Sequence, residues 1–342
     1  MNAPTKNAAP LVVLLALAVA ASAGAATLRV PSQHPTMQEA LQAASAGDTV
    51  LVAPGEYKEK IEIKPGVVLR SEKGPDSTSI VSTAVAGNVL DEKLVVILPG
   101  ADRSTVFEGF TLQGGLLKGA GVFCEGASPT IRGNVMRELG WGINLRSSDA
   151  LIEDNVIENC KGFGIAIFAS SPELRRNTLD HNEPRAISVG GRKSKPIIGG
   201  RREYANRIFE NTYAIVNESR NDVAAQWNDW GWTTTAEMER ADYPADISVL
   251  LDGNDFGSAG RGKGKIDYRN WIRPDEKALA ESPNPVAPAP AGGDSLAHAS
   301  PSGAAAAAPA AARAAGTRWL VPALLAIGLV ALFVIVSRRR SP

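Results

Sequence analysis

An asparagine recurs at nearly constant spacing in the middle of this 342-residue chain, and this repeat constrains the fold more than any other feature. The four asparagines, spaced 21, 22 and 29 residues apart, are Asn134, Asn155, Asn177 and Asn206. Each is followed by a short alternating apolar segment: Gly142–Leu145, Gly164–Ile167, Ala186–Val189 and Ala214–Val216. A period near 22 residues is typical of solenoids, in which each repeat forms one coil.

The repeat units have the character of strands rather than helices. Short alternating apolar triplets broken by Gly and Asn are strand and turn signals, and no unit carries the frame of a leucine-rich repeat. We therefore predict an all-β, right-handed parallel β-helix of roughly eight to ten coils. Alternate side chains should point inward, with Ile143, Ile165, Ile187 and Ile215 in one stack. The recurrent asparagines should form an internal ladder, because a buried amide needs hydrogen-bond partners.

A short helix is expected upstream of the repeats. Residues 36–44 are amphipathic, with Thr36 at the N-cap and Glu39 at the capping-box position. Strands are expected at 49–52 and 60–63, joined by a turn at 53–56. An open solenoid end exposes its apolar cross-section and an unpaired edge, so we predict that this helix caps the N-terminal end.

Several segments resemble pectin-lyase-like right-handed parallel β-helix repeat proteins of the secreted bacterial type. The entry Thr36–Ser71, the Asn-x-Ile…Gly-Ile units, and the closing segments Gln226–Gly231 and Lys265–Tyr268 carry the resemblance, which covers about Thr27–Ile272. It implies the fold and an association with carbohydrate of the cell envelope. It does not fix an activity, because such repeats serve lyases, hydrolases, esterases, epimerases and non-catalytic binders alike.

The two ends of the chain read as targeting segments. Residues 1–23 have a basic start, an apolar stretch and small residues suited to signal-peptide cleavage. Residues 282–317 are rich in Ala and Pro and predict a disordered linker. Residues 319–337 predict a transmembrane helix, and the basic tail 338–342 favours the cytoplasmic side. We expect an exported β-helix, 27–275, anchored in the cytoplasmic membrane by its C-terminus.

Composition and cysteine usage narrow the chemistry. Thirty-six basic and 36 acidic residues give a net charge of zero, which argues against a general nucleic-acid binder. The two cysteines, Cys124 and Cys160, are too few for a disulfide framework, and we expect buried free thiols. Residues 252–255, Asp-Gly-Asn-Asp, resemble part of a calcium loop but lack its far ligand, so we expect a turn there, with no metal or other cofactor.

The candidates for catalysis lie on one repeat. No carboxylate pair, histidine motif or arginine motif of the enzymes with this fold is present. What remains is a segment with an acid, a base and a cation: Asp180, His181, Glu183 and Arg185. Neighbouring coils should align Glu158 and Arg137 with Asp180. A histidine beside carboxylates suits acid–base work; the alternative is a solvated turn of mixed charge.

The candidates for ligand binding lie further on. The 29-residue spacing places about seven extra residues within 190–204, which should form a loop outside the stacked core. Its basic side chains suit an anionic polymer, whereas the alternative is an ordinary soluble loop. Indoles nearby offer platforms for sugar rings or pack the last coils. The predicted binding residues are Arg192, Lys193, Lys195, Arg201, Arg202, Trp227 and Trp230.

These features favour a membrane-anchored module that binds polysaccharide without turnover. Two other functions stay open, a polysaccharide lyase or glycoside hydrolase with an atypical site and a structural spacer or assembly protein. Aligned basic and aromatic side chains on the coil surface would favour the binder, and two facing carboxylates would favour the enzyme.

Overall fold

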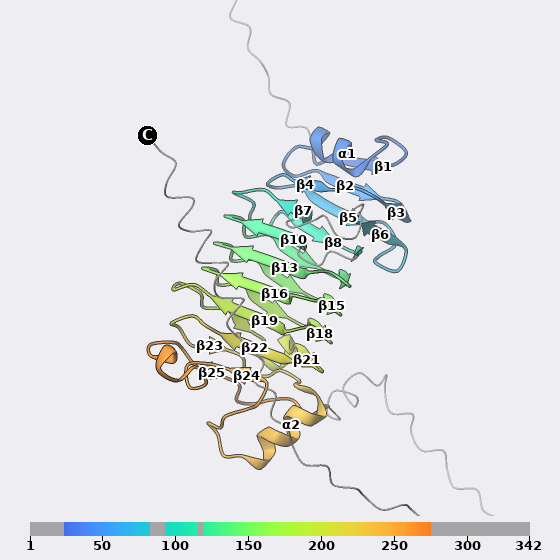
Figure 1. Cartoon of the computed structure of the whole chain (residues 1–342). Helices are drawn as coiled ribbons and strands as arrows, with labels where there is room; N and C mark the ends of the chain where they lie inside the picture. The colour runs from blue at the N-terminus through green and yellow to red at the C-terminus, as the bar shows by residue number, and fades with distance from the viewer. Residues whose placement is uncertain (1–23, 83–92, 115–118, 275–342) are drawn as a thin grey trace, which may run out of the picture. The chain divides into compact units, whose positions relative to one another are not determined.

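The chain winds into stacked coils, and each central coil adds one strand to each of three parallel sheets (Figure 1). The computed structural model describes residues 24–82, 93–114 and 119–274. Strands of successive coils pair in parallel throughout the central repeats, so the predicted parallel β-helix is confirmed.

The three sheets are named A, B and C in the order in which a coil visits them. Sheet A consists of β1 (Thr27–Val30), β2 (Thr49–Val52), β5 (Val68–Ser71), β8 (Val106–Glu108), β11 (Thr130–Arg132), β14 (Leu151–Glu153), β17 (Glu173–Arg175), β20 (Ile197–Ile198), β23 (Val223–Ala224) and β25 (Ile266–Asp267). Sheet B consists of β3 (Gly55–Tyr57), β6 (Thr78–Val81), β9 (Thr111–Gln113), β12 (Val135–Arg137), β15 (Val156–Glu158), β18 (Thr178–Asp180) and β21 (Arg207–Phe209). Sheet C consists of β4 (Ile61–Ile63), β7 (Lys93–Ile97), β10 (Ala120–Glu125), β13 (Trp141–Arg146), β16 (Phe163–Phe168), β19 (Arg185–Gly190), β22 (Tyr213–Asn217) and β24 (Leu250–Leu251).

The interior is a set of apolar stacks that follow the strand register. The predicted stack on sheet C is present, because Ile143 pairs with Ile165, Ile165 with Ile187, and Ile187 with Ile215. All four side chains are fully buried. Burying each such side chain contributes about 1.5–3 kcal/mol, so these stacks supply much of the stability of the coils.

The predicted asparagine ladder runs along the corner between sheets A and B. Asn155 donates through Nδ2 to Asn177 Oδ1 at 3.0 Å, and Asn177 donates in the same way to Asn206 Oδ1 at 3.0 Å. Asn134 joins at one end and Asn228 at the other. Each amide oxygen also accepts a backbone N–H of the preceding coil, for instance that of Asn155 at 3.1 Å from Asn177 Oδ1. The ladder therefore fixes the stacking of the coils at this corner.

Helical segments close both ends of the stack (Figure 1). Helix α1 (Met37–Ala43) packs on β1, β2 and β4, and Thr36 Oγ1 accepts its cap bond from the Glu39 N–H, as predicted. The Glu59 carboxylate also accepts the N–H groups of Met37 and Gln38, both at 3.1 Å. At the other end, helix α2 (Gly231–Arg240) packs against β21, and the 3₁₀ segment η2 (Gly257–Gly260) follows it in the chain. The turn expected at 53–56 differs, since β3 begins at Gly55.

The basic insertion is not one external loop. Two of its extra residues precede β20 and five follow it, where they form the 3₁₀ segment η1 (Arg202–Tyr204). Ile198 of β20 is fully buried and continues an inner stack from Leu174. The prediction of a loop wholly outside the core is therefore wrong: the insertion lengthens the coil at two corners and keeps its strand in sheet A.

The predicted signal peptide 1–23, the linker 282–317, the transmembrane segment 319–337 and the tail 338–342 lie outside the described residues. Over 24–82, 93–114 and 119–274, no helix has both the length and the apolar character needed to span a membrane.

Candidate functional site

A row of aromatic and cationic side chains crosses four coils of sheet C. Strand register aligns Trp141 with Phe163, Phe163 with Arg185, and Arg185 with Tyr213. The Trp141 and Phe163 rings stack with centroids 5.9 Å apart and planes inclined by 26°. The Arg185 guanidinium carbon lies 5.5 Å from the Phe163 centroid. All four side chains are half-buried. We call this row, Trp141, Phe163, Arg185 and Tyr213, the sheet C ladder.

The ladder lies beside a row of small polar and apolar side chains on the same outer face. Asn144, Ala166 and Ser188 align in register across β13, β16 and β19. Arg185 Nη1 reaches over this row to Ser188 Oγ at 3.0 Å. The row continues into Phe123 at one end and into Val216 at the other, and Asn144 and Val216 are buried, so small and partly exposed side chains flank the ladder only at Ala166 and Ser188.

A glycine makes room for the first indole of the ladder. A Cβ added at Gly162 would lie 2.5 Å from Trp141 Cδ1 and 2.6 Å from its Nε1, closer than real Cβ contacts permit. The indole therefore rests on bare backbone at Gly162. The added Cβ would also lie 2.7 Å from the Gly140 carbonyl oxygen, so a larger residue would displace Trp141, this backbone or both.

A second cation–aromatic group extends the same face toward the N-terminal end. Lys93 Nζ lies 4.3 Å above the Phe123 ring, and the Arg146 guanidinium carbon lies 5.8 Å from it. Phe123 aligns in register with Asn144, in the row of small side chains. Contacts of this kind within about 6 Å are attractive and hold long basic side chains over a ring. The outer face of sheet C thus combines rings, cations and hydrogen-bonding groups over six coils.

The catalytic candidates lie at the corner between sheets B and C, and they point in different directions. His181 Nδ1 is 2.6 Å from Asp180 Oδ1, and His181 Nε2 is 3.2 Å from Glu210 Oε2 on the next coil. Glu183 instead faces Lys161 of the preceding coil at 3.5 Å. Arg185 turns onto the sheet C ladder and lies 3.4 Å from Glu218. Only Asp180 and His181 are brought together, and Glu210, which sequence reasoning missed, joins them.

The Asp180–His181–Glu210 group could hold a metal ion through one atom of each side chain, since the three atoms lie within 4.8 Å of one another. However, the imidazole fills the space between the two carboxylates. In a glycosidase pair that space must receive a glycosidic oxygen or a water molecule. The expected alignment of Arg137 and Glu158 with Asp180 is present in the register of sheet B.

The predicted basic ligand-binding residues are exposed but divided between two corners. Arg192, Lys193 and Lys195 lie where the chain passes from sheet C to sheet A. Arg201 and Arg202 lie where it passes from sheet A to sheet B, beyond β20. The five side chains therefore do not form one patch.

The two predicted indole platforms lie at the C-terminal end of the stack. Trp230 is only 1% exposed and packs in the core, so it presents no ring face to solvent. Trp227 is half-buried in a left-handed turn with φ of +62°. The exposed indole of this segment is Trp232, at 67%. This placement matches the alternative in which the segment packs the last coils.

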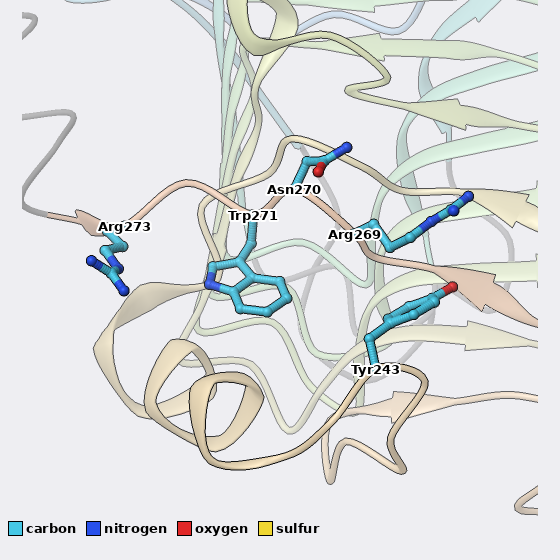
Figure 2. A pocket seen from close by; sticks show the side chains of 5 residues that line it. All are labelled: Tyr243, Arg269, Asn270, Trp271 and Arg273. Carbon is cyan, nitrogen blue, oxygen red and sulfur yellow. The ribbon is translucent and has the colours of Figure 1, made fainter.

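A pocket of about 440 Å³ opens beside the last coil, lined by Tyr243, Arg269, Asn270, Trp271 and Arg273 (Figure 2). Arg269 bonds Asp267 through Nε at 2.8 Å and Nη2 at 2.6 Å, and Arg273 Nε bonds Glu239 at 2.6 Å. These bonds with Arg269 are the main reason that the pKa of Asp267 lies below its ordinary value. Because both arginines are already neutralised by carboxylates, the pocket offers little net charge to an anion.

The remaining candidates are structural. Cys124 and Cys160 are buried free thiols, as expected. Burial raises the pKa of Cys160 to about 12 and that of Cys124 further, so both stay protonated and unreactive. Asp252 accepts the Asn254 N–H at 2.9 Å and the Ile266 N–H at 3.1 Å, which makes the predicted turn.

The central coils match a known sequence family. Residues 102–202 fit the family model described as "Right handed beta helix region". This chain carries a right-handed β-helix. No protein of curated function matches the sequence.

Two solved structures resemble the right-handed β-helix at low identity. The deglycosylated pectin methylesterase from Aspergillus niger is 12% identical, with a TM-score of 0.35, over 72% of this chain and 98% of that one. The ORF18 protein of Geobacillus virus E2 is 15% identical, with a TM-score of 0.27, over 56% of this chain and 35% of that one. At such scores neither likeness indicates a substrate or an activity.

Proposed function

We propose that this protein is a polysaccharide-binding module in which a glycan chain lies along the sheet C ladder and is not cleaved. The observation that carries the proposal is the register of Trp141, Phe163, Arg185 and Tyr213 across four successive coils. Coils are spaced about 4.8 Å apart, close to the length of one sugar ring in a linear glycan. Successive sugar rings can therefore contact successive members of the ladder.

The chemistry of the row matches that of a sugar. One side of a pyranose ring is a plane of C–H bonds, which packs against the negative face of an aromatic ring. Trp141 and Phe163 stack on each other, and Arg185 lies over Phe163, so these rings offer a sugar the parts that this stack leaves exposed. The rim of a sugar carries hydroxyls, and Ser188 and Arg185 lie beside the rings as hydrogen-bonding groups. The cations over Phe123, Lys93 and Arg146, favour a glycan with acidic groups, whereas Arg185 over Phe163 already pairs with Glu218.

The sequence supplies the remainder of the proposal. The signal peptide expected at 1–23 would export the β-helix, and the apolar segment 319–337 would hold it at the cytoplasmic membrane, with the linker 282–317 between them. The glycan partner would then belong to the cell envelope or to its surroundings.

Affinity measurements on ladder variants test this proposal. A glycan array on the right-handed β-helix, residues 24–281, identifies the polymer, and calorimetry then compares variants. Trp141→Ala should bind about tenfold more weakly, because about 1.4 kcal/mol of contact is lost. Trp232→Ala removes an indole that is 67% exposed on α2 and is the matched control, expected to bind as the wild type does. Equal affinity for all three proteins would rule out the sheet C ladder.

A gentler variant tests the ladder without removing a ring. Gly162→Ala adds one methyl beneath the Trp141 indole. We expect it to weaken glycan binding although Gly162 has no side chain with which to contact a sugar. Gly55→Ala is the control, because Gly55, like Gly162, lies outside the left-handed region and its added Cβ would make only ordinary contacts of 3.4 Å or more with the Tyr57 ring.

One observation favours an enzyme as the second candidate. Asp180 and Glu210 flank His181 on the corner that leads into the ladder, and a lyase or hydrolase would place its acid–base group there. If the array polymer is slowly cleaved, His181→Ala should abolish cleavage while leaving binding intact. Cleavage that survives this substitution would remove the group from consideration.

A further inference from the structure

The pocket of about 440 Å³ beside the last coil has aromatic rings in its wall (Figure 2). We call it the C-terminal pocket. Two of its lining residues, Tyr243 and Trp271, pack on the same buried ring, that of Tyr268, with centroids 5.1 and 6.3 Å away. The Tyr268 hydroxyl in turn accepts the Ala245 N–H at 2.8 Å. The two lining rings are therefore held in place, and Tyr243 remains 42% exposed.

The polar groups of the C-terminal pocket are of two kinds. Its arginines, Arg269 and Arg273, are already bonded to carboxylates. By contrast, the Asn270 amide and the Trp271 indole N–H form no hydrogen bond within residues 24–82, 93–114 and 119–274. The pocket thus offers uncommitted N–H donors beside aromatic faces, with little net charge.

Such a surface suits an uncharged proline-rich segment. A polyproline II chain has no internal hydrogen bonds, so its carbonyl oxygens are free to accept bonds from indole and amide donors. Grooves lined by aromatic side chains recognise such segments, and the fixed conformation of proline keeps the entropy cost of binding low. A charged ligand matches the pocket less well, because both arginines are neutralised.

The chain itself carries such a segment a short distance along the sequence. Residues 282–285 are Ser-Pro-Asn-Pro and carry no charge. They lie outside the described residues and follow Arg273, which lines the pocket, by nine to twelve positions. Nine residues span up to about 30 Å when extended, which is ample for a return to a pocket that Arg273 itself lines. A tether this short gives an effective concentration of the order of millimolar, so even a weak contact would be occupied.

We propose that residues 282–285 bind in the C-terminal pocket of the same chain. The two prolines would pack on the Tyr243 and Trp271 rings, and the Trp271 indole N–H would donate to a carbonyl oxygen of the segment. This contact would fix the point at which the chain leaves the β-helix. It does not involve the sheet C ladder, so either proposal can fail without the other.

Indole NMR of the full chain in detergent micelles tests the proposal. The Trp271 indole N–H signal, assigned by its loss in Trp271→Phe, reports on the pocket. Pro283→Ala combined with Pro285→Ala should move this signal, because the segment is released. A synthetic peptide of residues 281–288, added to this double variant, should move the signal back in a saturable way. The wild type should need about tenfold more peptide for half-saturation, because its own segment competes at high effective concentration.

Matched variants distinguish this contact from its alternatives. Pro301→Ala combined with Pro309→Ala, further along the chain, should leave the Trp271 signal at its wild-type position. In the Pro283 and Pro285 double variant, adding Tyr243→Ala should abolish the response to peptide, whereas adding Trp232→Ala should preserve it. Identical Trp271 signals in the wild type and the double variant would overturn the proposal. Half-saturation at the same peptide concentration in both proteins would also overturn it, and would indicate a pocket for a separate partner.

Discussion

Removal of one rung of the asparagine ladder should cost more stability than removal of almost any surface side chain. Asn177 is fully buried. Its Oδ1 accepts from the backbone N and from Nδ2 of Asn155, at 3.1 and 3.0 Å. Its Nδ2 donates to Ile152 O at 2.8 Å and to Asn206 Oδ1 at 3.0 Å. At about 0.5–1.5 kcal/mol for each bond, Asn177→Ala should lower the free energy of unfolding by about 2–6 kcal/mol.

Equilibrium urea unfolding of residues 24–281, followed by far-ultraviolet circular dichroism, measures this loss. Asn254→Ala, on an exposed turn, is the matched control and should change stability by no more than about 0.5 kcal/mol. Asn177→Asp sharpens the test, because it keeps the acceptor for Asn155 but turns a carboxylate oxygen toward Ile152 O and Asn206 Oδ1. At neutral pH it should be less stable than Asn177→Ala. A loss below 0.5 kcal/mol for Asn177→Ala would refute the claim that the ladder holds the coils in register.

Three further predictions follow from the same structure. Ile165→Asp removes about 1.5–3 kcal/mol of burial and places a carboxylate in the inner stack, so the domain should lose its cooperative thermal transition; a native-like melting curve would contradict the stack. Asp267 has a pKa below its ordinary 3.8, mainly through Arg269, so its contribution to stability should be present above that pH and be lost as the pH falls through the folded pKa. The gap in unfolding free energy between wild type and Asp267→Asn should therefore narrow in acid, and a gap that widens would oppose this. Protease added to spheroplasts should remove the β-helix and spare a tag at Pro342, and the opposite pattern would reverse the proposed orientation.

The coils could be predicted from the sequence because the spacing of the repeat equals the spacing of residues that pair between neighbouring strands. The isoleucines and asparagines recur at the coil period, and each stacks on its copy one coil away. A residue type that is required at the same inner position of every coil recurs in the sequence at the coil period. The helix cap at Thr36 was equally local, because it needs only a side-chain oxygen three residues before an N–H group.

The sheet C ladder could also have been predicted from the sequence, by comparing the residues that directly precede the repeated apolar segments. Trp141, Phe163, Arg185 and Tyr213 each stand directly before the small residue that opens an apolar segment. Because these four residues differ in type, no repeated residue identifies them. They share only their position on the outer face of sheet C. The basic insertion misled for the opposite reason. Its charges are close in sequence, but a buried strand, β20, lies between them and sends them to different corners.

Residues that belong together through different coils were the hardest to predict. Glu210 reaches His181 only because the two occupy equivalent left-handed turns, with φ of +54° and +49° on successive coils. Their separation of 29 residues includes the insertion, which hides the equivalence from a fixed period. Tyr204 meets Arg175 in the same way, across the lengthened corner.

The central claim, binding without turnover along sheet C, is tested most directly by recovering the bound polymer. The right-handed β-helix is incubated for a day with the polysaccharide selected on the array, at saturating concentration. The length distribution of the polymer, its reducing ends and its unsaturated ends are then measured beside Trp141→Ala and a protein-free control. Our account predicts that the wild type retains the polymer, that Trp141→Ala retains much less, and that all three polymer samples are identical in length and ends. Shortened chains or new ends that appear only with the wild type would contradict it.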